Sequence, residues 1–214
     1  MNFKKNRLLL SERFYFFLEY KNMFKLKDKL KFININQDYL KYLHECCSEV
    51  YYKQFNYVNK PYLGILINED NNQYVIPLSS AKEKHKNWKN IETDRFLIYE
   101  NCSKSTISKK AVYKENEDGT VKHIYSVIDI KKMLPIKDGL YSVVDLCVQE
   151  NDSVEQRNYK NLMNKEFSFC IKILPLIIQK ANKLYSKQIE TGHVIKFCCD
   201  FKLLEEKCRE YTVD

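Results

Sequence analysis

The residues best suited to chemistry lie close together in the first half of the chain. Ser79 and Ser80 directly follow the apolar run 74–78, and basic side chains come next, namely Lys82, Lys84, His85 and Lys86. Ammonium groups neutralise the negative charge that builds up on phosphorus oxygens during phosphodiester cleavage, and hydroxyls bind those oxygens through hydrogen bonds. The segment therefore predicts a pocket for a phosphodiester in which side chains supply the positive charge and no metal is required.

A further lysine reaches the same place if the preceding segments form a hairpin. Residues 61–67 and 73–78 are apolar and rich in β-branched side chains, and the polar stretch 69–72 between them is typical of a turn. Lys60 stands just before the first strand, so an antiparallel partner brings it near Ser80 and Lys82. We expect two hydroxyls and two ammonium groups to converge at this end of the hairpin.

These residues also have plainer structural interpretations. Two serines after a strand are most often a turn, and a lysine-rich loop is usually solvated surface. His85 could act as a general acid or base because an unperturbed histidine titrates near pH ~6.5, yet a single loop histidine is more often inert. Tyr39, at the start of the first expected helix, is either a core residue or a donor in the site. Trp88, Tyr57 and Tyr62 either stack on bases or fill the core.

A separate hypothesis comes from Ser80 and Lys82, which have the Ser-x-Lys spacing of an acyl-transfer dyad. It makes the chain a serine hydrolase, although nothing in the sequence marks an oxyanion hole. The P-loop, G-x-S-x-G, H-E-x-x-H and dinucleotide fingerprints are all absent. Large nucleotide cofactors are therefore not expected, and we predict no cofactor.

The segments around the hairpin predict a small domain of short strands with helices at its edge. Asn36 can cap a helix in which Leu40, Leu43 and Cys47 recur at three- and four-residue spacing. Further strands are expected at residues 95–99, 111–114, 120–127 and 133–136. Several short strands separated by turns are typical of a small antiparallel barrel. The predicted fold class is therefore α+β, with a small antiparallel β-barrel core and peripheral helices.

Helical character returns in the last third of the chain. Residues 153–156 read Ser-Val-Glu-Gln and have the form of a capping box, and apolar side chains then recur toward Leu184. Pro175 lies among them, and proline clashes with the preceding helical turn, so we expect a kink or a break there. Gly192 is expected to end this region, and Asp200 to cap a last helix.

The formal net charge of +8 is concentrated at the amino terminus. Residues 1–31 hold nine Lys or Arg and three Asp or Glu, which gives +6 and leaves +2 for residues 32–214. We therefore predict a basic extension over residues 1–31 and one globular domain over residues 32–214. The extension is either a helical arm docked on the domain or a segment upstream of the real start, since Met23 lies within it.

Composition excludes several classes of protein. A hydrophobic fraction of 44% with 16 Tyr and 12 Phe can fill a core, which argues against disorder. No uncharged apolar run approaches the roughly 20 residues that span a bilayer, and a leucine run at residues 8–10 is too short for a signal peptide. The eight cysteines include no Cys-x-x-Cys pair. We expect reduced thiols in a cytoplasmic protein, with no zinc site.

Six segments together carry a resemblance to a known family. They are Asp38–Leu43, Lys60–Ile65, Tyr74–Lys82, Met133–Ile136, Tyr159–Phe167 and Cys199–Lys207. Each is unspecific by itself, but in this order across residues 36–211 they resemble the ToxN/AbiQ family, the protein toxins of type III toxin–antitoxin and phage abortive-infection systems. Residues 1 to about 30 have no counterpart in the resemblance.

The resemblance implies a metal-independent endoribonuclease with a Kid/MazF-like, SH3-like barrel core that cuts A-rich RNA and leaves a 2′,3′-cyclic phosphate and a 5′-hydroxyl. The implied partners are target mRNA and an RNA antitoxin, a repeated RNA that folds into a pseudoknot and assembles with the toxin into closed protein–RNA oligomers. Phage infection or stress releases the toxin. No DNA or membrane partner is implied. A non-catalytic RNA-binding module on the same barrel is the alternative.

Matched residue by residue, the Thr/Ser-Ser-x-Lys element of the family falls on Ser79, Ser80 and Lys82. The family's lysine before the first barrel strand falls on Lys60, and the tyrosine of its first helix on Tyr39. In the implied reaction the ribose 2′-hydroxyl attacks the adjacent phosphorus in line, and these lysines and serines stabilise the charge of the phosphorane.

The proton transfers stay open at this stage. His85 matches a histidine that only some relatives have, so it is kept, with Lys84 and Lys86, as a candidate for catalysis or RNA binding. Serine has too high a pKa to act as the base. A lysine of lowered pKa, His85 or Tyr39 must therefore handle the proton, and the sequence does not distinguish among them.

Overall fold

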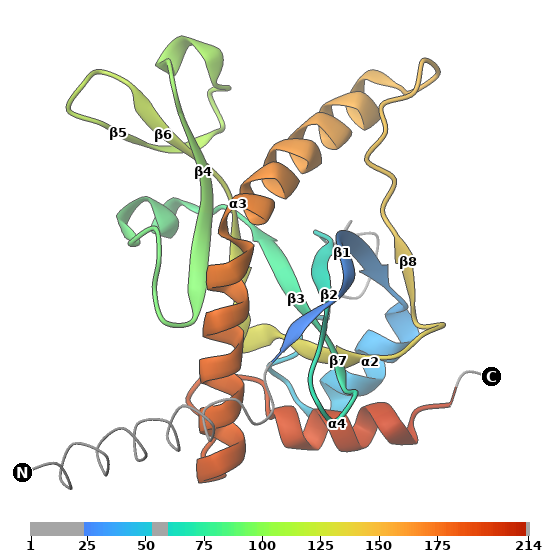
Figure 1. Cartoon of the computed structure of the whole chain (residues 1–214). Coiled ribbons are helices and arrows are strands. Elements are labelled where there is room, and N and C mark those ends of the chain that lie inside the picture. Colours follow the sequence, from blue (N-terminus) through green and yellow to red (C-terminus); the bar gives the residue numbers. More distant parts are fainter. Residues whose placement is uncertain (1–23, 53–59, 213–214) are drawn as a thin grey trace, which may run out of the picture.

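The computed structural model describes residues 24–52 and 60–212 and has an α+β fold (Figure 1). Its eight strands are β1 (Lys25–Ile35), β2 (Tyr62–Ile67), β3 (Gln73–Ser80), β4 (Arg95–Cys102), β5 (Val112–Glu115), β6 (Val121–Asp129), β7 (Leu134–Ile136) and β8 (Tyr141–Val143). Its α-helices are α2 (Gln37–Cys46), α3 (Val154–Thr191) and α4 (Phe201–Glu210). A short 3-10 helix, η1 (Glu83–Asn87), follows β3 directly.

All strand pairs are antiparallel, and β3 joins the two parts of the sheet. Residues 73–77 of β3 pair with β2, and residues 78–80 pair with β6. The strand order is β4-β6-β3-β2-β1-β8, with β5 added on β6 and β7 added on β3. Among the described strands no ladder links β4 to β8, so the sheet has two open ends. The predicted closed barrel is therefore not confirmed, although the α+β class is.

The predicted hairpin is confirmed in its position. Tyr62 lies opposite Pro77, and Ile67 lies opposite Gln73. Gly64 lies opposite Val75, and the position requires glycine because a Cβ atom there would lie 2.8 Å from Cγ1 of Val75. The four later strands that the sequence predicts also exist as β4 to β7, with bounds that differ by a few residues.

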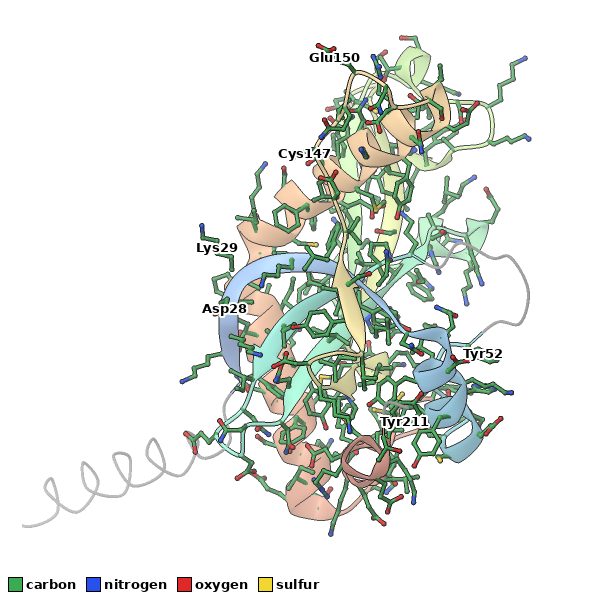
Figure 2. The ribbon with its side chains drawn as sticks, turned by 90° about the vertical axis from the view of Figure 1, so that its right-hand side faces the viewer. Asp28, Lys29, Tyr52, Cys147, Glu150 and Tyr211 are labelled. Carbon is green, nitrogen blue, oxygen red and sulfur yellow. The ribbon has the colours of Figure 1, made fainter. Side chains whose placement is uncertain are left out.

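Strand β1 runs through the boundary predicted between residues 31 and 32. Phe24, just before the strand, is buried in the core, and its backbone N–H donates to the side chain of Asn182. The chain is extended from residue 25 onward, so the described part of the predicted extension is a sheet strand and not a helical arm. Figure 2 shows Asp28 and Lys29 on the outer curve of this strand. Residues 1–23 lie outside the described residues.

The helices begin where the sequence places their caps. Asn36 Oδ1 accepts from the backbone N–H groups of Asp38 and Tyr39 at the start of α2. Helix α3 runs unbroken for 38 residues with Pro175 inside it, so of the expected kink or break the break does not occur. Figure 1 shows instead that the axis of α3 changes direction partway along, as a proline within a helix causes. Gly192 ends α3 in the left-handed conformation.

A buried carboxylate organises the core between the sheet and α4. Glu205 accepts hydrogen bonds from the hydroxyls of Tyr74, at 2.8 Å, and Tyr185, at 2.7 Å. The side-chain amide of Asn68 in turn donates to the Tyr185 hydroxyl, at 3.2 Å. Buried polar groups that satisfy one another in this way fix the relative positions of β3, α3 and α4.

Candidate active site

Six of the residues that the sequence predicts for the site line one cavity of about 220 Å³. They are Lys60, Ser79, Ser80, Lys82, Lys84 and His85. The two ammonium groups and the two hydroxyls on which the phosphodiester hypothesis depends therefore line the same space. Aromatic side chains, those of Tyr51, Tyr52, Tyr62 and Trp88, form much of the remaining wall. Figure 2 shows Tyr52 beside α2.

The end of the hairpin creates this cavity. The N–H of Leu78 donates to the carbonyl of Pro61 at 3.2 Å, and β2 extends no further in that direction. Strand β3 continues to Ser80, and among the described strands β6 alone pairs with Ser79 and Ser80, so no described strand covers their other edge. Lys60 precedes Pro61 and therefore reaches this open edge.

The two serines reach the cavity from opposite faces of β3, because successive side chains of a strand alternate. Ser80 lies opposite Ser126, on the face that packs against the main core. Ser79 lies opposite Val127, which belongs to a small apolar cluster on the other face. A ligand held by both hydroxyls must therefore contact the end of the strand itself.

His85 supports the loop that carries Lys82. Its ring is 3% exposed, and its Nδ1 accepts a hydrogen bond from the backbone N–H of Lys82 at 3.0 Å. Burial lowers the pKa of His85 to about 4, and the positive charges of Lys84, Lys82 and Arg95 contribute to the same shift. The ring is therefore neutral at pH 7, with its proton on Nε2.

A stack of side chains continues from His85. The ring centroid of Trp88 lies 4.3 Å from that of His85, and the Arg95 guanidinium lies 3.9 Å from the Trp88 centroid. Lys84 Nζ lies 5.4 Å from the same centroid. Cations within about 6 Å of an indole face are attracted to it. The stack places positive charge beside the cavity and leaves Trp88 as part of its wall.

Lys60 has a partner that the sequence reasoning did not select. Its Nζ forms an ion pair with Oε1 of Glu166, from the first half of α3. Glu166 is 0% exposed, and the side chain of Lys60 is 12% exposed. The signal for Glu166 lies in the helix pattern, because it falls between the buried Met163 and Cys170 at three- and four-residue spacing.

Asp129 is a second carboxylate that the sequence reasoning missed. It lines the cavity at the end of β6, and the Tyr51 hydroxyl donates to its Oδ2 at 3.4 Å. Burial raises the pKa of Asp129, while Lys131 and Lys132 lower it. Among the described residues its Oδ1 has no hydrogen-bond partner. That oxygen is itself buried, so Asp129 places a carboxylate with one unsatisfied oxygen next to the predicted phosphate site.

Two predicted site residues do not line the cavity. Tyr39 is fully buried, its hydroxyl donates to the carbonyl of Pro135 at 2.9 Å, and burial raises its pKa far above the usual value. The structure thus assigns Tyr39 to the core, the first of the two interpretations given above. Lys86 pairs with Glu83 at 2.6 Å and lies over the ring of Tyr113. Tyr57, named as a stacking candidate, lies outside the described residues.

The described side chains form neither a metal centre nor a membrane segment. Within residues 24–52 and 60–212, no group of three or more His, Cys, Asp or Glu side chains is arranged to hold a metal ion. The described helices include none with the length and apolar character needed to cross a bilayer. All eight cysteines are free thiols, and four of them are buried.

Comparison with known proteins agrees with this architecture. The sequence profile of the family described as toxin ToxN of the type III toxin–antitoxin system matches residues 31–209. The endoribonuclease ToxN of Bacillus thuringiensis subsp. kurstaki is 29% identical over 192 residues, which is 86% of each chain. The endoribonuclease AbiQ of Lactococcus lactis subsp. lactis is 26% identical over 87% of this chain and 92% of its own.

Solved structures share the fold. A chain from work on selective toxin inhibition by a non-coding RNA pseudoknot in type III systems has a TM-score of 0.61 and 25% identity, covering 86% of this chain and 98% of that one. The structure of AbiQ, a lactococcal anti-phage endoribonuclease, also has a TM-score of 0.61, at 24% identity over the same shares. Because the family profile spans most of the sequence, this chain belongs to the ToxN family of toxins of type III toxin–antitoxin systems.

Proposed function

We propose that this protein is an endoribonuclease toxin that cleaves RNA by attack of a ribose 2′-hydroxyl on the adjacent phosphorus. The observation that carries the proposal is the convergence of Lys60, Ser79, Ser80 and Lys82 on one cavity. Relatives at 26–29% identity over most of the chain are named endoribonucleases, which supports the same activity here.

The chemistry follows from what charge does during the reaction. In-line attack on phosphorus places additional negative charge on the non-bridging oxygens. Lys60 and Lys82 neutralise it, and the hydroxyls of Ser79 and Ser80 donate hydrogen bonds to it. Each donor of this kind stabilises a transition state by about 3 kcal/mol. The 5′-oxygen then leaves, and the products are a 2′,3′-cyclic phosphate and a 5′-hydroxyl.

The geometry reduces the number of groups that can accept the proton of the 2′-hydroxyl. His85 accepts a hydrogen bond at Nδ1, so its Nε2 carries a proton and cannot accept another while that bond lasts. Tyr39 lies outside the cavity. Of the groups that the sequence left open, the lysines remain, and Asp129 joins them because it lines the same cavity.

Family membership supports a proposal for the partners. One related structure concerns selective toxin inhibition by a non-coding RNA pseudoknot, and we propose that an RNA antitoxin of this kind, built from a repeat, occupies the same cavity and surrounding surface here. Target mRNA is the substrate, and closed protein–RNA oligomers are the silent form. Cleavage in the cytoplasm after phage infection then gives abortive infection.

The curved sheet is proposed to be a distorted, Kid/MazF-like barrel.

The test is cleavage of total bacterial RNA by purified protein in the presence of EDTA. We expect new 5′-hydroxyl ends and 2′,3′-cyclic phosphates, and we expect Ser80→Ala and Lys82→Ala to lose cleavage by about 10²-fold while keeping the wild-type circular dichroism spectrum. Binding of RNA without any cyclic phosphate would support the non-catalytic module instead. Labelling of Ser80 by a fluorophosphonate probe would support the serine hydrolase.

A further inference from the structure

Glu166 is a carboxylate on the buried face of a helix. The side chains of α3 that are buried between residues 163 and 177 are Met163, Glu166, Cys170 and Ile177. An apolar residue at position 166 would fit this face without the cost of taking a carboxylate out of water. Packing alone therefore does not account for a charged residue here.

The ion pair with Lys60 fixes a side chain that is otherwise flexible. A lysine ammonium ends a four-carbon stem and normally stays hydrated. Here Lys60 Nζ is held by Glu166 Oε1, from a residue 106 positions away, while the same side chain lines the cavity. The docking of α3 against the sheet therefore sets where this ammonium lies.

Ser126 lies near Glu166 and belongs to the hydroxyl side of the cavity. Ser126 is fully buried and lies directly opposite Ser80 in the β3–β6 ladder, so the two side chains share one face of the sheet. The Ser126 hydroxyl is near enough to lower the pKa of the Glu166 carboxyl, but among the described residues neither Ser126 Oγ nor Glu166 Oε2 has a hydrogen-bond partner. Glu166 is thus close to Lys60 on one side of the cavity and to Ser126, the ladder partner of Ser80, on the other.

We infer that Glu166 is a positioning residue of this cavity, which holds the Lys60 ammonium in the place where it meets a phosphate of the bound RNA. Glu166 has no exposed surface, so it acts through Lys60 and does not touch the substrate. The inference rests on the proposed function, because it assigns a role within the same reaction.

The geometry also gives a pH dependence. Burial raises the pKa of Glu166, while Lys60 and Ser126 lower it. The other titratable groups that face it are Tyr159 and Cys170 of α3, whose pKa values burial raises and the charge of Glu166 raises further. A raised carboxyl pKa means that acidification protonates Glu166 earlier than an ordinary glutamate, and the ion pair is then lost. Cleavage should therefore decline on the acid side of the profile.

The experiment compares kcat, KM and pH profiles on the RNA that the wild-type protein cleaves fastest. Glu166→Gln keeps the shape and removes the charge, and we expect kcat to fall by about 10²-fold with little change in KM. Glu166→Asp should recover part of that loss. Lys60→Met/Glu166→Gln should be no slower than Lys60→Met alone, because the carboxylate acts through the lysine. Glu205→Gln, which removes a buried carboxylate outside the cavity, should keep the wild-type kcat.

Each outcome decides the inference. A folded Glu166→Gln variant with the wild-type kcat and acid limb would overturn it, as would a double variant much slower than Lys60→Met. If Glu166→Gln fails to fold, Lys60→Met/Glu166→Met restores an apolar contact and must cleave as Lys60→Met does, or the inference is wrong. A wild-type protein that cleaves no RNA overturns the proposed function and this inference together, whereas wild-type cleavage with an unaffected Glu166→Gln overturns the inference alone.

Discussion

The backbone N–H of Lys82 donates to Nδ1 of His85 across 3.0 Å, and this bond ties the loop after β3 into a short 3-10 turn. A reverse bond runs from the His85 N–H to the Lys82 carbonyl at 2.8 Å. The two bonds together close the turn. The histidine that the sequence offers as an acid or base is therefore a structural support for a lysine of the cavity.

The first prediction concerns the stability of the protein in acid. The pKa of folded His85 is about 4, below the unfolded value of about 6.5. Between these two values the unfolded chain binds a proton that the folded chain does not, so the contribution of His85 is complete above pH ~6.5 and is lost as the pH falls. Urea unfolding at pH 7 and pH 4.5 should show wild type losing about 1–2 kcal/mol more than His85→Asn.

The second prediction concerns the same variant in catalysis. In His85→Asn the new side-chain amide oxygen can still accept the Lys82 N–H, but an amide cannot transfer a proton, so kcat should stay within about 10-fold of wild type. General acid–base residues contribute about 10²- to 10⁴-fold. A loss in that range, with the fold intact by circular dichroism, would make His85 a proton-transfer group after all.

The third prediction contrasts two lysines four residues apart. Lys82 lines the cavity, whereas Lys86 pairs with Glu83 at 2.6 Å outside it. Lys82→Met should lower the single-turnover cleavage rate by about 10²-fold. Lys86→Met removes an equal charge from the same loop and should leave that rate within about 3-fold, since exposed pairs contribute about 0–1 kcal/mol. Equal losses in both variants would point to general attraction of RNA rather than to a placed ammonium.

The fourth prediction separates stability from activity. Tyr185→Phe removes the donor that reaches Glu205 at 2.7 Å and the acceptor that meets Asn68. Leaving buried polar groups without partners costs about 1–3 kcal/mol, so the urea midpoint should fall. The cleavage rate of the folded protein should stay at the wild-type value because Tyr185 does not line the cavity. A lowered rate at full folding would show that this core network extends to the site.

The sequence predicts the parts of the site that depend on local register. Once residues 61–67 and 73–78 form a hairpin, Lys60, Ser80 and Lys82 must meet at its end. Glu166 and Asp129 come from distant elements, and only the packing of α3 and the β3–β6 pairing bring them there. Their long separation in sequence left no spacing pattern to connect them to the serines.

The fold was predictable to a similar extent. Strands bounded by turn residues and helices with clear caps were found, but β1 was hidden because its lysines make the alternation look like a basic tail. Whether a set of short strands closes into a barrel depends on which ends pair, and periodicity carries no information about that. Tyr39 is a different case. Its position beside Leu40 and Leu43 on α2 indicates a core residue more directly than its match to a family tyrosine indicates a site residue.

Strand β3 pairs with β2 along one part and with β6 along the next, and the cavity depends on both pairings. Lys60 is anchored to the ladder of β2, whereas Ser79 and Ser80 are held by the ladder of β6. Local fraying of the β3–β6 pairing would separate these groups while most hydrophobic residues stayed packed. Melting curves that report on the whole molecule would then overstate the fraction of active protein. The temperature at which activity is lost would be set by the stability of β3 at the point where its pairing changes from β2 to β6.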